Sequence, residues 1–125
     1  MNAAQHIADL DAALAEDGED VTLRRPISTI VNVDVTCRAF VRAVGADEIA
    51  AGITQDTSNV IISPTEINAE GWPGDNLTGV SELLDRRVPN TRDQIVIAGK
   101  TRQVIAAAPI YVAGELVRIS LRVKG

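Results

Sequence analysis

The sequence predicts a mainly β protein that begins with one α-helix. Two observations predict this class. Apolar residues first recur at helical spacing, up to about Gly18, and from Val21 onward they alternate with polar residues, which is the period of a half-buried strand. Gly and Pro then separate the alternating segments. A chain of 125 residues is expected to form a single domain, residues 1–125, with the helix at 3–16 and the β structure at 21–123.

Residues 3–16 are predicted to form an amphipathic helix. Its apolar stripe consists of Ala3, Ile7, Leu10 and Leu14. Asn2 is a suitable N-cap with Gln5 three residues on, and Gly18 is a suitable stop. Acidic residues crowd the C-terminal end, where the helix dipole favours cations: Glu16, Asp17, Glu19 and Asp20. So short a helix is marginal in water, and its stripe must dock either on its own barrel or on a neighbouring subunit.

The clearest strand signal covers residues 31–42. One face of this strand is apolar, formed by Val31, Val33, Val35, Cys37, Ala39 and Val41. Shorter strands are expected at 21–25, 60–63, 94–98, 102–112 (interrupted by Pro109) and 116–123. In the last of these, the core-facing residues are Val117, Ile119, Leu121 and Val123. Five or six strands in this order favour a small antiparallel β-barrel of the SH3- or OB-like kind.

Two long loops are expected within this barrel. Residues 45–59 and 66–92 carry no consistent period, although residues 81–87 could hold a helical turn. Loops of this length in a small domain are either functional or disordered.

Charge and cysteine content exclude several classes of protein. The formal net charge is −5, whereas a protein that wraps nucleic acid usually carries clustered positive charge. Cys37 is the only cysteine, so no intramolecular disulfide can form, and its place in the long strand predicts a buried thiol. The chain has neither a signal peptide nor an apolar run long enough to cross a bilayer, which predicts synthesis in the cytoplasm and no membrane contact.

No catalytic, metal or cofactor motif emerges, and we therefore expect the chain not to be an enzyme. The Gly99-Lys100-Thr101 tripeptide lacks both the upstream glycine and the following helix of a phosphate-binding loop. One Cys and one His cannot form a zinc site. The acidic segment 9–20 lacks the order of a calcium loop. Cys37 and His6, on a strand and a terminal helix, are not expected to form a nucleophile–base pair.

Two aromatic residues have open interpretations. Phe40 lies between Arg38 and Arg42 on the polar face of the long strand, where it could stack a base or pack in a protein interface. Trp72, in a Gly-Trp-Pro-Gly segment, could clamp its loop onto the barrel or anchor a partner.

Four segments carry a resemblance to a known family. They are residues 12–25, residues 60–67, the Trp72-Pro73 pair and the closing hairpin at 93–100. In their order and spacing they resemble the head–tail joining, or head-completion ("stopper"), proteins in the neck of tailed bacteriophages and gene transfer agents.

The resemblance implies a structural protein of the virion neck that is made in the host cytoplasm. Such proteins are small β-barrels that assemble into a sixfold or twelvefold homo-oligomeric ring. The ring lies between the portal and adaptor proteins on the head side and the tail terminator or tail tube on the other. Members are not enzymes, need no cofactor and help to retain the packaged DNA, which they contact transiently in the channel.

Carried over by position, the loop that projects into the channel falls in residues 45–59. Its candidate residues are Gly45, Asp47, Glu48, Gly52, Gln55 and Asp56. An acidic loop offers phosphates no cationic site, so it would let the duplex slide. The alternative is that residues 45–59 form an ordinary solvated surface loop. Candidate residues for contacts with other subunits or the tail are Phe40, Trp72, Arg86 and Arg87.

Two other functions fit the same pattern. The first is a tail terminator or tail-completion ring, which has a similar small fold and a different partner. The second is a monomeric barrel that binds single-stranded nucleic acid through Phe40, Arg38 and Arg42.

Overall fold

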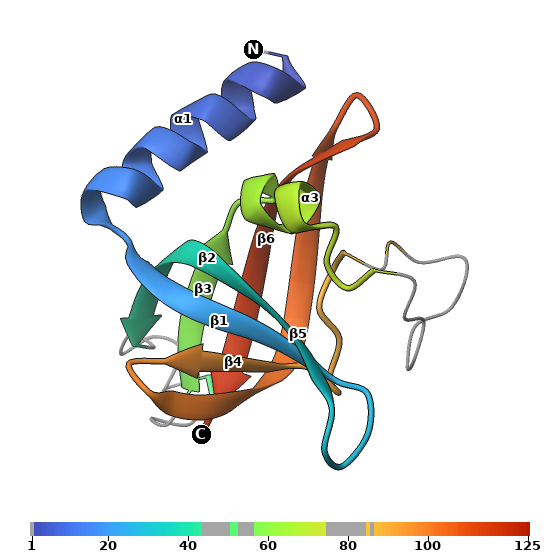
Figure 1. Cartoon of the computed structure of the whole chain (residues 1–125). Helices are drawn as coiled ribbons and strands as arrows, with labels where there is room; N and C mark the ends of the chain where they lie inside the picture. Colours follow the sequence, from blue (N-terminus) through green and yellow to red (C-terminus); the bar gives the residue numbers. More distant parts are fainter. Residues whose placement is uncertain (1, 44–50, 53–56, 75–84, 86) are drawn as a thin grey trace.

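The computed structural model describes residues 2–43, 51–52, 57–74, 85 and 87–125. Six antiparallel strands close into a barrel in the order β1-β2-β3-β6-β5-β4, and a helix precedes them (Figure 1). The elements are α1 (Ala3–Asp17), β1 (Glu19–Pro26), β2 (Asn32–Ala43), β3 (Thr57–Ile62), α3 (Thr65–Glu70), β4 (Gln94–Ile97), β5 (Lys100–Val112) and β6 (Glu115–Lys124). The predicted fold class, a small antiparallel barrel with an N-terminal helix, is confirmed.

Helix α1 begins and ends as its sequence predicts. Asn2 and Gln5 form a capping box, in which each side chain accepts a hydrogen bond from the other residue's backbone N–H. The helix ends before Gly18, whose backbone is extended. A Cβ at Gly18 would lie 2.5 Å from the carbonyl oxygen of Leu14 and 2.9 Å from that of Ala39. Glycine is therefore required by the close approach of helix and barrel.

The apolar face of β2 fills the barrel. Val35, Cys37 and Ala39 are at most 3% exposed and belong to one core cluster. Val31, which we expected on the same face, precedes the strand and is 46% exposed. In β6 the expected core set is buried, as are the alternate positions of β1 and β4. The alternation of apolar and polar residues along the strands thus predicted most of the core.

Two expected loop boundaries are wrong. Strand β3 begins at Thr57, three residues earlier than predicted, so its first residues belong to the ladder with β6 and not to the loop. The segment after β3 was expected to be irregular but begins with the one-and-a-half-turn helix α3, whose Ile67 is buried in the core. Residues 75–84 and 86 lie outside the described residues, as does most of the helical turn expected at 81–87.

Strand β5 reaches beyond the barrel. It pairs with β4 only as far as Gln103 but continues to pair with β6 to Val112, so the β5–β6 hairpin projects at the end where α1 and α3 lie (Figure 1). Pro109 does not interrupt the strand. No described strand pairs with the other edge of β5 there, and an edge position of this kind tolerates proline, which has no N–H to donate.

Both C-terminal hairpins turn through two residues with positive φ. Ala98 and Gly99 connect β4 to β5, and Ala113 and Gly114 connect β5 to β6. Positive φ at both central positions is typical of the two-residue turns that match strand twist, and Asn is favoured over Ala at the first of them. Each alanine therefore holds a strained conformation.

The strain at Ala113 (φ +50°) predicts opposite effects for two substitutions in one turn. We expect Ala113→Asn to raise the free energy of unfolding by about 0.5–1 kcal/mol, because Asn tolerates the left-handed region. Gly114→Ala, at φ +81°, is expected to lower it by a similar amount. Urea denaturation of both variants measures the two effects. A loss of stability in Ala113→Asn would contradict this turn geometry.

Helix α1 docks on the barrel of its own chain. It contacts β2 and β6, and it buries Ala3 and Leu14 at the end of the barrel that α3 also covers (Figure 1). Of the two docking modes left open by the sequence, the structure contains the one within the chain. In the described part of the chain, no helix is long and apolar enough to cross a membrane.

Candidate functional site

The described residues contain no group of three or more His, Cys, Asp or Glu side chains able to hold a metal ion. His6 is exposed on α1, and Cys37 is 1% exposed inside the barrel. Burial raises the pKa of the Cys37 thiol to about 12, with a smaller contribution from the charge of Glu66. A thiol with this pKa is protonated at neutral pH and is therefore a poor nucleophile.

The high pKa of Cys37 predicts that the native thiol is unreactive. With an aromatic disulfide reagent at about pH 8, we expect little labelling of the folded protein and rapid labelling in denaturant. The rate of native labelling would then follow the opening of the barrel. Fast, complete labelling without denaturant would contradict the burial of Cys37.

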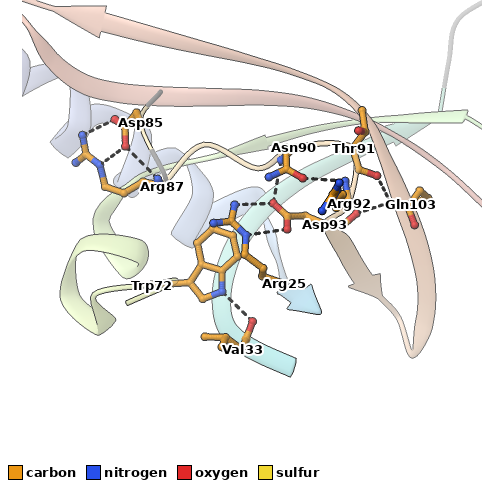
Figure 2. Close-up of polar contacts among 10 residues, drawn as sticks. All are labelled: Arg25, Val33, Trp72, Asp85, Arg87, Asn90, Thr91, Arg92, Asp93 and Gln103. Carbon is orange, nitrogen blue, oxygen red and sulfur yellow. Dashed lines mark hydrogen bonds and ion pairs between the residues drawn. The ribbon is translucent and has the colours of Figure 1, made fainter. Parts of the chain in front are cut away.

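The most tightly organised polar group in the described structure is a buried ion pair at one end of the barrel (Figure 2). Arg25, on β1, donates from Nε to Asp93 Oδ1 at 2.9 Å and from Nη2 to Asp93 Oδ2 at 2.8 Å. The two side chains are 1% and 0% exposed. Buried charges are stable only when their remaining hydrogen-bonding capacity is also used.

Neighbouring groups complete the bonding of Asp93. Its Oδ2 accepts a second hydrogen bond from the backbone N–H of Asn90, at 2.8 Å. Its backbone carbonyl accepts from the side chain of Gln103 and from the backbone N–H of Val104. The carboxylate thus accepts three hydrogen bonds from protein groups, which indicates a structural role.

Trp72 covers the same ion pair. The Arg25 guanidinium carbon lies 4.7 Å from the centroid of the Trp72 ring, and Trp72 Nε1 donates to the carbonyl of Val33 at 2.9 Å. Trp72 is 3% exposed. The start of the long segment between α3 and β4 is therefore tied to β1 and β2, and its end is tied to β1 and β5. This geometry supports the loop-clamping interpretation of Trp72, because an interface anchor needs an accessible ring.

Arg38, on strand β2, caps the C-terminal end of helix α1. Its guanidinium donates to the carbonyl oxygens of Leu14 (3.2 Å), Ala15 (3.3 Å) and Gly18 (2.7 Å). It also pairs with Asp20 at 3.3 Å. The cation that the acidic helix end lacks in its own sequence is therefore supplied by β2. Arg38 is occupied in this way, so the base-binding set of Phe40, Arg38 and Arg42 loses one member.

Glu66, in the first turn of α3, faces β2 and lies close to two other acids. Its Oε2 accepts a hydrogen bond from the backbone N–H of Arg38 at 2.9 Å. Burial raises the pKa of Glu66, the Arg38 N–H bond lowers it, and the charges of Asp11 and Asp20 raise it further; the net shift is upward.

The raised pKa of Glu66 predicts a pH dependence of stability. A carboxyl group with a higher pKa in the folded state binds its proton more readily there, so stability rises as pH falls through that pKa. We expect Glu66→Gln to be more stable than the wild type at about pH 7 and to lose this advantage below about pH 4. Glu70→Gln, exposed on the same helix, is the matched control and should change little. A neutral-pH loss of stability in Glu66→Gln alone would contradict the account.

A second polar cluster fixes Arg87. Its guanidinium forms a two-point ion pair with Asp85 (Figure 2). It also donates to Asn68 Oδ1 on α3 at 2.9 Å. Tyr111 donates its hydroxyl to Asp85 Oδ2 at 3.2 Å. The hydrogen bonds and charge of Arg87 lower the pKa of Asp85. Arg87, a candidate for contacts with other proteins, is therefore paired within its own chain.

Phe40 lies on a four-stranded surface that we call the outer sheet face. The strand registers align two rows of outward residues across β2, β3, β6 and β5. The first row is Phe40, Ile61, Ser120 and Ala108, and the second is Arg42, Asn59, Arg122 and Ala106. Grooves of about 380 Å³ and 200 Å³ lie over these rows and share Asn59. Asp17 and Glu19 line one edge of the larger groove.

The candidate channel loop lies mostly outside the described residues. Gly45, Asp47, Glu48, Gln55 and Asp56 are not described, and neither is Arg86. Gly52 is described and exposed, with φ +99°. The role of this loop therefore rests on the sequence alone.

Sequence reasoning missed the buried ion pair, although a signal for it was present. Arg25 is two residues from Leu23 and four from Val21, so it is expected on the same face of the strand as these two core residues. Asp93 is likewise two residues from the core residue Ile95. The alternation of side chains along the strands would therefore have placed both charges inside the barrel, where they must pair.

The fold and its polar groups define a small closed β-barrel whose organised interactions hold its own segments together. No family model, curated protein or solved structure matches the chain.

Proposed function

We propose that this chain is a structural protein of the neck of a tailed phage or gene transfer agent. In this role it forms a ring that joins the DNA-filled head to the tail and helps to retain the DNA. The resemblance in sequence led to this proposal, and a small closed barrel is the architecture that the resemblance implies.

The observation that carries the proposal is the position of the exposed apolar residues. The loop between β1 and β2 bears Ile27, Ile30 and Val31, of which Ile30 is 90% exposed. The β5–β6 hairpin bears Ile110 and Tyr111, each 44% exposed. These two projections point away from each other at opposite ends of the barrel (Figure 1). Apolar projections of this kind mark contact sites, and a connector needs one on each side.

The acidity of the chain supports the same role. A channel that holds DNA and later releases it should not bind phosphates tightly, and a net charge of −5 opposes such binding.

The test is reconstitution of particles. Filled heads assembled without this chain are mixed first with the purified protein and then with tails. We expect the protein to protect the packaged DNA from nuclease and to allow tail joining. Ile30→Ser should fold normally but either retain less DNA or join fewer tails, depending on the side that this loop faces, whereas Thr29→Ala, the exposed neighbour, should behave as the wild type. Equal DNA retention and tail joining with and without the protein would contradict the proposal.

The same components separate a head-completion ring from a tail terminator. The proposal expects the purified chain to bind adaptor-bearing heads before any tail is added. Binding to isolated tail tubes alone would favour the tail terminator.

A further inference from the structure

Two faces of the described surface carry charges of opposite sign. Helix α1 contains no Lys or Arg, and the two rows of the outer sheet face contain no Asp or Glu. The outward side of α1 carries exposed alanines beside exposed acids. The alanines are Ala4, Ala8, Ala12 and Ala15, and the acids are Asp9 and Glu16.

These two faces also match in spacing. Asp9 and Glu16 are seven residues apart, which is about 10.5 Å along a helix. Arg42 and Arg122 lie in one row with a single strand between them, which is about 9.6 Å across a sheet. A helix laid along the rows can therefore bring both acids over both arginines at once.

The two rows also match the two flanks of the helix. The neighbouring row is largely apolar or small, with Phe40, Ile61 and Ala108. Alanine side chains let a helix approach such a surface closely, so the alanine flank fits over this row while the acidic flank lies over Arg42 and Arg122. Arg42 forms no ion pair with any residue that the structure describes. Arg122 already donates from Nε to Asn59 Oδ1 at 3.2 Å, so an acid from a second copy would add to the contacts of this guanidinium.

We propose that the outer sheet face of one copy binds the outward side of α1 of a second copy, with Asp9 and Glu16 opposite Arg42 and Arg122. Within its own chain α1 uses the opposite side, which includes Leu14, so the outward side stays available. Because the two surfaces differ, the contact is head-to-tail, and repeated contacts close into a ring when the rotation permits. The interface rests on the proposed function, since it takes the neighbouring ring subunit as the partner.

A nucleic acid fits this face less well. Asp17 and Glu19 line the edge of the larger groove, where they would face the phosphates. A helix from a second copy, laid along the rows with Asp9 over Arg42 and Glu16 over Arg122, turns its N-terminal end toward that edge. Residues 2–8 at this end contain no Asp or Glu, and the positive end of the helix dipole favours nearby acids.

The test is charge reversal on each face. One variant combines Asp9→Arg with Glu16→Arg, and the other combines Arg42→Glu with Arg122→Glu. Sedimentation velocity of the wild type should show association that weakens with salt. Each variant alone should associate about 100-fold more weakly, because two attractions become repulsions. An equimolar mixture of the two variants should associate again. Lys100→Glu and Glu70→Arg, exposed outside both faces, serve as controls.

Each outcome decides the interface separately from the proposed function. Circular dichroism first checks that each variant is folded. If the variant with Arg42→Glu and Arg122→Glu is unfolded, Arg42→Glu alone replaces it. The exposed helix positions Asp9 and Glu16 test the contact in either case. Wild-type association that both variants leave unchanged would overturn this interface but not the neck function. A wild type that stays monomeric would also overturn it, and the reconstitution of heads would then decide the function. Binding of a labelled single-stranded oligonucleotide that only the sheet variant abolishes would assign the face to nucleic acid.

Discussion

Replacing Asp93 with alanine is expected to lower the free energy of unfolding by about 3–5 kcal/mol, because it leaves the Arg25 guanidinium buried and without its carboxylate. A domain of this kind has only about 5–15 kcal/mol in total, so the variant should be close to unfolded at physiological temperature. Urea denaturation followed by circular dichroism measures the loss.

The chain provides a matched control one residue away. Arg24 and Asp34 form a similar two-point ion pair on the surface, with side chains 28% and 40% exposed. Asp34→Ala is expected to cost at most about 1 kcal/mol, since an exposed pair gains little over water. The double replacement of Arg25 by Met and Asp93 by Leu should be less harmful than Asp93→Ala alone. Equal losses for Asp93→Ala and Asp34→Ala would contradict the burial of the ion pair.

Val35→Asp is expected to unfold the domain. Val35 is 3% exposed in the centre of the barrel core, and an unpaired carboxylate there costs more than about 4 kcal/mol. The next residue of the same strand, Thr36, is exposed, so Thr36→Asp should be tolerated. Far-ultraviolet circular dichroism and thermal melting of the two variants measure the difference. A folded Val35→Asp with an unfolded Thr36→Asp would show that the faces of β2 are reversed.

Local signals in the sequence predicted the parts of the fold that local rules determine. The capping box of Asn2 and Gln5, the stop at Gly18 and the alternation along β2 each depend on neighbouring residues alone. The alternation of residues along β6 likewise predicted which of its side chains enter the core.

Apart from the buried ion pair, the missed features depend on contacts between distant segments. Arg38 reaches the end of α1 only because β2 and the helix meet in three dimensions, and no spacing in the sequence encodes that meeting. Helix α3 is six residues long, too short to show a helical period, and is held by the burial of Ile67. Trp72 could be read as a clamp or an anchor until its contact with Arg25 was known.

The candidate site was predicted less well than the fold. Phe40 does lie on a grooved surface, but its partners there come from three other strands that only the register brings together. Arg87 is a free cation in the sequence and a paired one in the structure, because Asp85 and Asn68 converge on it. Surface function depends on such convergence, whereas the core follows from alternation.

The central claim, that this barrel serves to join a head to a tail, is tested most directly by a cryo-electron-microscopy reconstruction of the neck of the tailed particle that encodes it. The account predicts a ring of closed six-stranded barrels at the junction, with the loop bearing Ile30 and the hairpin bearing Tyr111 each touching a different neighbouring ring. A complete neck in which no density fits this barrel would contradict it.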